Sequence, residues 1–305
     1  MSIRLFIRTL GRRILRTSNL SELLRKRRLS LKRRFYRAPF SLDQTRELLI
    51  KLGVSRGRVV WVQSSWNEFY NLNAKPSEVL ALILDILGPQ GTLVMPAFPI
   101  DQDPGKVLEI DFVPSSSGLL TEIFRRQPGV LRSIHLSASV CALGPAADYL
   151  IRDHHRDPFP WGDQSPYQRL TELDARLVCL GLGRFVSNLT PLHSVECLLY
   201  NELPYFKQIF QGTVKYQWRR KTGEHGEHEF RTRLGHINLR GYGRHFHRNS
   251  YVECRLSSLD AYAIDARSAI DQAVALARRG ITIYSNPRPL PEMFVPVGLN
   301  RSRMS

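Results

Sequence analysis

Short apolar runs alternate with amphipathic segments along the chain from residue 41 onwards. Five runs have the length and the continuous hydrophobicity of buried strands, at residues 58–65, 91–98, 137–144, 176–183 and 281–285. Three segments between them space their apolar side chains as helices do and stop at Gly or Pro, at residues 77–88, 118–129 and 191–203. Such alternation is typical of helices packed on a parallel sheet. We therefore predict an α/β fold, an α/β/α sandwich with a largely parallel central sheet.

One segment breaks this alternation. Residues 215–233, with the sequence KYQWRRKTGEHGEHEFRTR, predict a β-hairpin that turns around Gly223–Gly226. We expect this hairpin to be an insertion into a single domain formed by residues 41–305. Apart from the basic N-terminal segment, the chain contains no low-complexity tract, and it contains no internal repeat.

The first 40 residues differ from the rest of the chain in charge. They contain thirteen Lys or Arg against one acid, Glu22, so they carry twelve of the seventeen net positive charges. Pro39 is expected to close this segment. We treat residues 1–40 as a separate basic module and residues 41–305 as the globular domain.

A helical wheel of the N-terminal segment separates its apolar side chains from its arginines. Ile3, Phe6, Ile7, Leu10 and Ile14 share one side, and the other side carries Arg4, Arg8, Arg12 and Arg16. This pattern favours a helix that lies in an anionic membrane surface. A nucleic-acid arm, a targeting peptide and a helix packed on a partner are the alternatives. As a partner of this segment, nucleic acid is less favoured than an anionic membrane surface.

Composition indicates a globular chain in a reducing compartment. Of its 305 residues, 43% are hydrophobic, and no apolar run approaches the length of about 20 residues that a membrane-spanning helix needs. The cysteines have neither a CxxC motif nor zinc-like spacing, and we expect free thiols at Cys141, Cys179, Cys197 and Cys254. We predict a cytoplasmic protein, peripheral to the inner face of the membrane through residues 1–40.

Several common functional motifs are missing from the sequence. It contains no GxxxxGK[ST], no GxSxG and no GxGxxG, so ATP hydrolysis, serine hydrolysis and dinucleotide binding lack motif support. A metal site is the alternative for the histidine-rich region, which contains His225, His228, His236, His245 and His247. That region has no HExxH, and its spacing fits a polar hairpin followed by a loop. We therefore expect no metal.

The segment NLTPLHSVE, residues 188–196, has the pattern of a helix start. Thr190 is a suitable N-cap and Pro191 suits the first helical position. His193 then lies in the first turn, and Glu196, three residues on, shares its helix face. A carboxylate in that position could orient an imidazole as a base. From these residues alone, a histidine that merely forms a hydrogen bond in a core or cap remains the alternative.

Five segments of the chain together resemble the aminoglycoside 3-N-acetyltransferase-like family. They occur in the same order as in that family and at about the same spacing. The similarity covers about residues 42–235, with a weaker match at 260–285. The segments are VVWVQSSW, LGPQGTLVMPAF, SSSGLLTEIFRRQPGVLRSIHLSASVCALGP, DPFPWGDQSPYQRLTELDARLVCLGLG and NLTPLHSVE. The resemblance implies an α/β/α fold and transfer of an acetyl group from acetyl-CoA to an amine on a sugar ring, without a metal.

The resemblance also implies roles for individual residues. His193 and Glu196 match the family's TxLHxxE, which favours His193 as the general base that deprotonates the acceptor amine. His135 matches the histidine of the family's RSxHPxxS, although Leu136 replaces the proline, and it is a further catalytic candidate.

Four residues are candidates for binding CoA. Ser64 and Ser65 match the family's HSS at the end of a strand, although Gln63 replaces its histidine. Arg132 and Ser133 match the RS that precedes the family's histidine, and a guanidinium suits CoA phosphates.

The acceptor is predicted from bulk charge. Aminoglycosides are polycations, and enzymes that act on them profit from acidic clefts, whereas residues 41–305 of this chain are mildly basic and residues 1–40 strongly basic. We therefore expect an anionic acceptor, a nucleotide- or lipid-linked amino sugar of surface-polysaccharide assembly. The alternatives are an aminoglycoside antibiotic and a catalytically inactive relative that binds membrane or nucleic acid. A metal-dependent hydrolase that uses the histidines of residues 225–247 is a further rival.

Overall fold

The structure is a computed structural model. It describes residues 27, 30–31, 33–183, 186, 188–239 and 241–297. The predicted amphipathic helix at Ile3–Ile14 lies outside the described residues. In the described part of the chain, no helix combines the length and the hydrophobicity that crossing a membrane requires.

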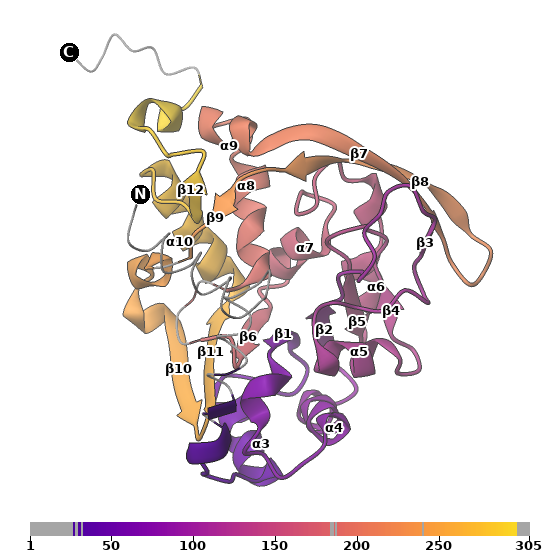
Figure 1. Ribbon diagram of the computed structural model, residues 1–305, viewed down its shortest axis with the longest axis vertical. Coiled ribbons are helices and arrows are strands. Elements are labelled where there is room, and N and C mark those ends of the chain that lie inside the picture. Colours follow the sequence, from indigo (N-terminus) through magenta and orange to yellow (C-terminus); the bar gives the residue numbers. More distant parts are fainter. Residues whose placement is uncertain are drawn as a thin grey trace, which may run out of the picture.

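A seven-stranded sheet runs through the centre of the molecule (Figure 1). Its strand order is β10-β11-β6-β1-β2-β5-β4. In chain order the strands are β1 (Val59–Ser64), β2 (Thr92–Pro96), β4 (Leu131–Arg132), β5 (Val140–Leu143), β6 (Arg176–Leu180), β10 (Tyr251–Leu256) and β11 (Leu259–Asp265).

The middle of the sheet is parallel and its flanks are antiparallel. β1 runs parallel to β2 and to β6, as predicted. The pairs β2–β5, β5–β4, β6–β11 and β11–β10 are antiparallel, so the predicted parallel arrangement is limited to the three central strands. The reason is clearest for β10 and β11, because only the two residues 257–258 join them, and so short a turn requires antiparallel strands.

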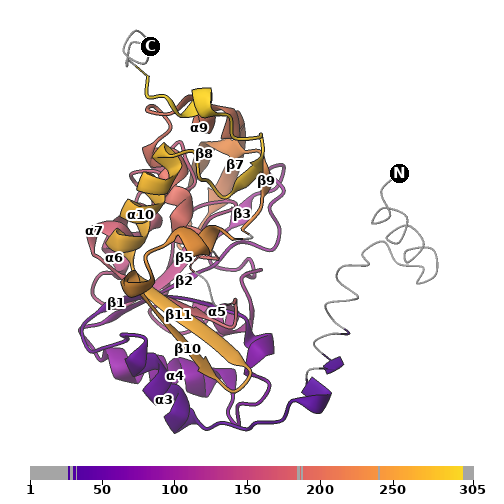
Figure 2. The ribbon, with the colours of Figure 1, turned by 90° about the vertical axis from the view of Figure 1, so that its left-hand side faces the viewer.

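Helices cover both faces of the sheet, which confirms the α/β/α sandwich. One face packs against α3 (Leu42–Lys51), α4 (Pro76–Leu87) and α5 (Leu119–Arg125). The other packs against α6 (Ala147–Ile151), α7 (Pro166–Glu172), α8 (Ser194–Leu198), α9 (Pro204–Ile209) and α10 (Ala266–Arg278). Figure 2 shows α10 above the long β10–β11 pair, with α3 and α4 below the pair.

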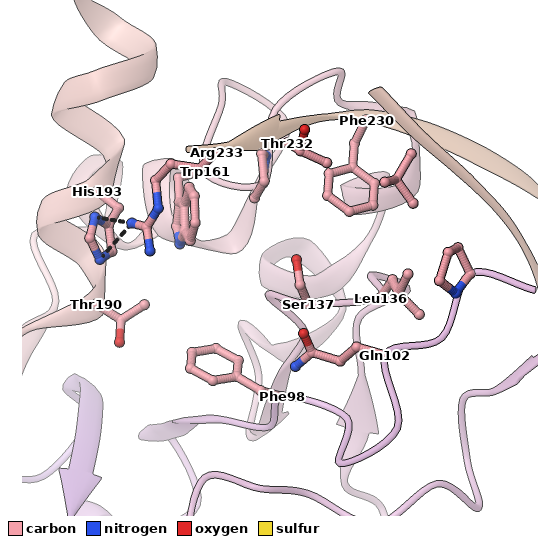
Figure 3. A pocket seen from close by; sticks show the side chains of 13 residues that line it. Phe98, Gln102, Leu136, Ser137, Trp161, Thr190, His193, Phe230, Thr232 and Arg233 are labelled. Carbon is pink, nitrogen blue, oxygen red and sulfur yellow. Dashed lines mark hydrogen bonds between the residues drawn. The ribbon is translucent and has the colours of Figure 1, made fainter. Parts of the chain in front are cut away.

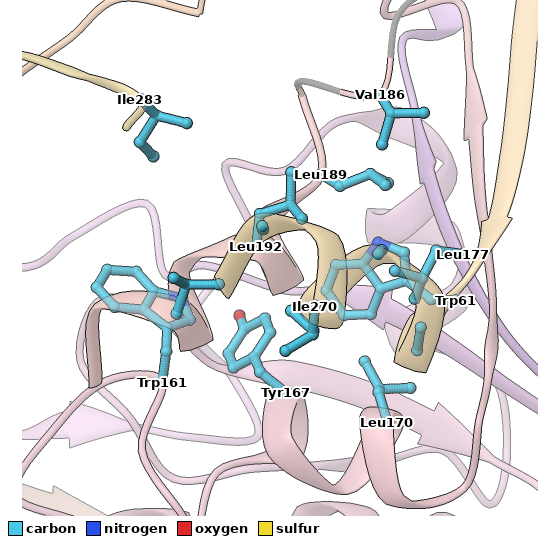
Figure 4. Close-up of a cluster of buried hydrophobic side chains, with 14 of the residues drawn as sticks. Trp61, Trp161, Tyr167, Leu170, Leu177, Val186, Leu189, Leu192, Ile270 and Ile283 are labelled. Carbon is cyan, nitrogen blue, oxygen red and sulfur yellow. The ribbon is translucent and has the colours of Figure 1, made fainter. Parts of the chain in front are cut away.

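Alternation along the strands produces these two separate cores. Val60 and Val62 point into the core under α3 and α4, whereas Trp61 between them points into the core under α7 and α10. All three side chains are fully buried. The Trp61 ring lies 5.7 Å from the Tyr167 ring of α7, and both belong to the cluster in Figure 4. A continuous apolar run was therefore the correct signal for a strand that is buried on both faces.

The predicted hairpin is confirmed and is longer than expected. β7 (Phe210–Arg219) pairs antiparallel with β8 (His225–Arg233), and β3 (Leu108–Glu109) joins β7 to complete a three-stranded sheet. Figure 1 shows this hairpin arching over the upper part of the molecule. A second small sheet pairs β9 (His236–Ile237) with β12 (Tyr284–Asn286).

Two sequence-based boundaries need correction. The strand expected at 281–285 is β12, which begins only at Tyr284 and belongs to the small sheet, because its partner is β9 and not a strand of the central sheet. The helix expected over 191–203 is split into a 3₁₀ turn, η3 (Thr190–His193), and α8. The other 3₁₀ turns are η1 (Trp66–Phe69), η2 (His154–Arg156), η4 (Tyr242–His245), η5 (Arg248–Ser250) and η6 (Pro291–Phe294).

All four cysteines are free thiols, as predicted. Cys141 and Cys179 are buried in central strands, where desolvation raises the pKa of each thiol to about 12. Cys197 and Cys254 are partly buried.

Replacing Trp61 tests the packing between the central strand and α7. We expect Trp61→Ala to lower the free energy of unfolding by about 3–5 kcal/mol, because it removes a fully buried indole and leaves a cavity. Ile50→Ala on the exposed face of α3 is the control and should change stability by less than about 0.5 kcal/mol. Urea denaturation followed by circular dichroism would measure both. A Trp61→Ala loss as small as that of the control would contradict the described packing.

Candidate active site

A cavity of about 470 Å³ opens beneath the β7–β8 hairpin, between it and the carboxyl end of the central strands (Figure 3). The hairpin, the loop after β2, the turn before β5 and η3 all contribute to its wall. Its lining is Phe98, Gln102, Pro104, Leu136, Ser137, Pro160, Trp161, Thr190, His193, Val214, Phe230, Thr232 and Arg233. An apolar wall with a few polar groups is typical of a site for a small organic ligand.

His193 and Glu196 form the pair that the sequence predicted. His193 Nδ1 lies 2.6 Å from Glu196 Oε1. Since the carboxylate can only accept a hydrogen bond, Nδ1 carries the proton and Nε2 keeps its lone pair. Glu196 is almost completely buried, whereas 15% of the His193 side chain is exposed, and His193 lines the cavity. The pair thus presents a basic nitrogen at the cavity wall.

The start of this segment differs from the prediction. Leu189 occupies the N-cap position, without a side-chain cap, and Thr190 is already inside the 3₁₀ turn. The Thr190 hydroxyl donates instead to Gln63 Oε1, at 3.2 Å, and the Thr190 amide donates to the same oxygen, at 3.3 Å. Gln63, in the position where the related family has a histidine, therefore ties β1 to η3.

The surroundings of His193 favour the neutral base. Desolvation lowers the pKa of the imidazole, the Glu196 carboxylate raises it, and the Arg233 guanidinium lowers it again, with a net shift below the usual 6.5. A histidine whose pKa lies below 6.5 is mostly neutral at pH 7 and is able to accept a proton.

Arg233 is a site residue that sequence reasoning missed. It is the last residue of β8, and its Nη1 lies 2.8 Å from His193 Nδ1 and 3.1 Å from Nε2. The guanidinium also lies 4.7 Å from the centre of the Trp161 ring. The sequence contains one feature that could have pointed to Arg233, namely its position as a basic residue at the end of the predicted hairpin. Only the fold brings that end of the hairpin to His193.

Ser64 and Ser65 lie where β1 ends, as predicted for this edge of the sheet. The Ser65 amide donates to the Leu180 carbonyl, and the carbonyl of Ser64 lies beside Gly118 at the start of α5. Both side chains are partly buried. Neither serine lines the cavity that contains His193.

Arg132 has a different environment from the one expected for a phosphate ligand. Its side chain is buried, and the guanidinium donates to the carbonyls of Ile110 at 3.1 Å, Val113 at 2.6 Å and Ala97 at 2.5 Å. Desolvation lowers the pKa of Arg132 to about 10, so it remains charged at pH 7. Its donors tie the loop after β2 and the loop after β3 to β4, a placement that favours a structural role over direct contact with CoA.

His135 and Ser133 also lie in the interior. His135 Nδ1 accepts hydrogen bonds from the Ser137 and Ala138 amides, at 3.1 and 3.0 Å, and the residue is fully buried. The Ser133 hydroxyl contacts His154 Nδ1 at 3.0 Å. The structure therefore does not bring either residue to His193.

Three buried imidazoles form a cluster beside the cavity. The His135 ring stacks on His154 at 4.6 Å and meets the edge of His228 at 5.3 Å. Desolvation lowers the pKa of all three, to about 3 for His154. Among the residues that the structure describes, no group of three or more His, Cys, Asp or Glu has metal-binding geometry.

Comparisons with known proteins agree with the resemblance in the sequence. Residues 61–278, more than two thirds of the chain, match the profile of the aminoglycoside 3-N-acetyltransferase family. Aminoglycoside N(3)-acetyltransferase IV of Salmonella sp. is 35% identical over 158 residues, which are 52% of this chain and 58% of that protein. The chain spans between 56% and 63% of the length of this relative and three others.

Solved structures share the fold. The crystal structure of aminoglycoside acetyltransferase AAC(3)-Xa is 23% identical, with a TM-score of 0.67 over 85% of this chain and 99% of that chain. The binary complex of AAC-IIIb with CoASH is 20% identical, with a TM-score of 0.67 over 81% of this chain and 100% of that chain. The profile match includes β1 from Trp61 onwards, the 131–135 segment, and both His193 and Glu196. The chain belongs to the aminoglycoside 3-N-acetyltransferase family.

Proposed function

We propose that the protein is an N-acetyltransferase that moves an acetyl group from acetyl-CoA to an amine on a sugar ring. The observation that carries this proposal is the His193–Glu196 pair, in which His193 lines a cavity large enough for a small ligand. Family membership supports acetyl transfer, and the solved relative named with CoASH supports acetyl-CoA as the donor.

The proposed reaction is direct transfer. The amine nitrogen attacks the thioester carbonyl carbon, a C–N bond forms and the C–S bond breaks. His193 Nε2 takes the proton that the amine loses, and the departing thiolate takes up a proton to leave as CoA-SH. Glu196 keeps Nδ1 protonated and stabilises the imidazolium while it exists. The cysteines in central strands are buried with raised pKa values, which disfavours a covalent acyl-cysteine.

The cavity suits the substrates of such a reaction. Phe98, Leu136 and Phe230 give it an apolar wall of the kind that accommodates a pantetheine arm. Gln102 and Ser137 add neutral polar groups that could contact sugar hydroxyls. Ser64 and Ser65 remain proposed CoA contacts from their position at the strand end. With Arg132 and Ser133 committed to interior hydrogen bonds, we propose no contact between these two residues and CoA.

The names of the relatives favour an aminoglycoside as the acceptor. They include several aminoglycoside N(3)-acetyltransferases, and these names favour an aminoglycoside over the nucleotide- or lipid-linked amino sugar expected from bulk charge. An aminoglycoside amine is therefore the first acceptor to test. Binding of CoA to the purified protein separates this enzyme from an inactive relative that serves only as a membrane or nucleic-acid binding protein.

Truncating His193 tests the assignment of the base. We expect His193→Ala to lower kcat by about 100- to 10,000-fold, because the amine loses its proton acceptor, while CoA binding and the circular dichroism spectrum stay unchanged. Glu196→Gln keeps the shape of the side chain and should have a smaller effect. Steady-state kinetics with acetyl-CoA and an aminoglycoside would measure both. Near-normal turnover by His193→Ala would refute the base assignment.

The pKa of His193 gives a pH prediction. Because the pKa of His193 in the folded protein lies below 6.5, the imidazole should be neutral at pH 6.5 and above. As the pH falls through this lowered pKa, the imidazole becomes protonated and can no longer act as a base. Glu196 raises this pKa, so Glu196→Gln should move it further down, whereas Arg233 acts in the opposite direction. An NMR titration of the His193 Cε1–H would measure the pKa directly. A His193 that titrates above 6.5 would contradict the desolvated environment.

We also propose that the N-terminal segment binds an anionic membrane surface. Its described end supports this, because Leu31 and Phe35, one helical turn apart, are exposed at 56% and 76% beside Arg33 and Arg34. Each basic side chain near an anionic surface can contribute about 1 kcal/mol.

Vesicle sedimentation tests this proposal. We expect the full chain to sediment with vesicles that contain anionic lipid, and a chain that begins at Pro39 to stay in solution but acetylate a soluble acceptor normally. A variant with Phe6, Ile7 and Leu10 replaced by Ser keeps every charge and should bind the vesicles less well. If that variant binds the vesicles fully, the segment acts only as a basic arm and not as a helix that lies in the membrane surface. Tighter binding to RNA than to lipid would refute the membrane proposal.

A further inference from the structure

Glu196 has one carboxylate oxygen that His193 does not use. Oε1 lies 2.6 Å from His193 Nδ1 and 3.7 Å from Arg233 Nη1. Oε2 is buried, and it forms no hydrogen bond with any of the residues that the structure describes. A buried carboxylate oxygen without a donor destabilises a folded protein, so this atom indicates a partner other than a directly bonded side chain.

A second, much smaller cavity lies against Glu196. Its volume is about 20 Å³, which is enough for about one water molecule. His193 lines the large cavity described above, whereas Glu196 lines this small one. Most of its wall is apolar, and its polar residues besides Glu196 are Tyr242, Thr282 and Tyr284. A water molecule in this place would therefore have polar groups to bind.

The hydroxyl of Tyr284 is a donor that needs an acceptor. Its oxygen is buried and, within the described part of the chain, it has no hydrogen-bond partner. Burial and then the charge of Glu196 raise the pKa of this phenol, so it keeps its proton at pH 7. A protonated phenol can donate a hydrogen bond, whereas an ionised carboxylate can only accept one. A donor and an acceptor thus lie at the wall of the same small cavity.

The small sheet holds the Tyr284 side chain in place. Tyr284 pairs with Ile237 of β9, and its amide donates to Thr282 Oγ1 at 3.2 Å. The residue is only 4% exposed. Gly235 makes room for the ring, because a Cβ at that position would lie 3.0 Å from Tyr284 Cδ1, closer than ordinary van der Waals contact. The hydroxyl therefore has a fixed position beside Glu196.

The other groups near the carboxylate add no negative charge at pH 7. Burial raises the pKa of the Cys197 thiol and of the Tyr205 and Tyr242 hydroxyls, so all three keep their protons. The guanidinium of Arg233 is a positive charge close to Oε1. Oε2 is thus the side of the carboxylate on which a neutral donor can act.

We propose that Tyr284 is a positioning residue, whose hydroxyl holds Glu196 Oε2 through one water molecule in the small cavity. The water accepts a hydrogen bond from the phenol and donates one to Oε2. This link keeps Oε1 turned towards His193 Nδ1 and draws part of the negative charge of the carboxylate towards Oε2. Tyr284 lies beyond residues 61–278, which match the family profile. The inference rests on the proposed role of His193 as the base and extends its support to the C-terminal segment.

An NMR titration of His193 provides the first test. Tyr284→Phe keeps the buried ring and removes the hydroxyl. We expect it to raise the pKa of His193 by about 0.5, because a carboxylate that lacks this donor stabilises the imidazolium more strongly. The control is Tyr205→Phe, since the Tyr205 hydroxyl donates to the Pro287 carbonyl at 2.9 Å, and this variant should leave the pKa of His193 unchanged. An unchanged pKa in Tyr284→Phe would overturn the inference.

A double-mutant cycle shows whether Tyr284 acts through Glu196. In a Glu196→Gln background, Tyr284→Phe should have no further effect on the pKa of His193. An equal rise in both backgrounds would mean that the hydroxyl acts on the imidazole independently of the carboxylate, and it would refute the proposal. A high-resolution crystal structure of the wild type should show a water molecule within hydrogen-bond distance of both Tyr284 Oη and Glu196 Oε2. A dry cavity there would also contradict the proposal.

Kinetics separate this inference from the proposed function. With acetyl-CoA and an aminoglycoside, Tyr284→Phe should lower kcat about 2- to 10-fold, the effect of a single hydrogen bond, and leave both KM values unchanged. A rise in KM alone would instead place Tyr284 against a substrate and contradict a positioning role. If the pKa of His193 moves as expected but no amine is acetylated, the proposed function fails while the link between Tyr284 and Glu196 stands.

Discussion

The buried carboxylate of Glu196 is the constraint on which the site depends. A carboxylate that is removed from water has to be paired with a hydrogen-bond donor or a positive charge. Without such a partner, its burial destabilises the folded protein by several kcal/mol. The pairing with His193 fixes the imidazole tautomer, leaves Nε2 as the basic atom, and places a negative charge that attracts Arg233 from the end of the hairpin. The tautomer and the orientation of the His193 ring thus depend on this single buried carboxylate.

The fold holds the His193–Glu196 pair in place through the central strand β1. β1, at the centre of the sheet, carries Trp61, which packs in one of the two cores. Two residues later, Gln63 Oε1 accepts hydrogen bonds from the amide and the hydroxyl of Thr190. From Trp61 the aromatic packing continues through Tyr167 to Trp161, whose ring lies 4.8 Å from that of His193. The 3₁₀ turn that presents His193 is therefore fastened to the central strand by both packing and hydrogen bonds. Such support limits the movement of the His193 ring.

Local patterns in the sequence predicted the elements that are buried on both sides and the His193–Glu196 pair, because a spacing of three residues within a turn fixes a contact regardless of the tertiary fold. They did not predict Arg233, which is forty residues from His193 and meets it only because the hairpin folds back over the cavity. The same limit applies to Arg132. Its motif matches the family, but whether a guanidinium faces solvent or three carbonyls depends on loops that are distant in sequence.

Four histidines near the cavity show why a lowered pKa does not by itself identify a base. Desolvation lowers the pKa of His135, His154, His228 and His193 alike. The first three are buried in the interior, where hydrogen bonds to backbone groups or to Tyr216 and Ser133 hold their rings. Only His193 combines a carboxylate on one nitrogen with a second nitrogen at the cavity wall. Since four histidines share a lowered pKa, it is the contact with Glu196 and the position at the cavity wall that distinguish His193 as the proposed base.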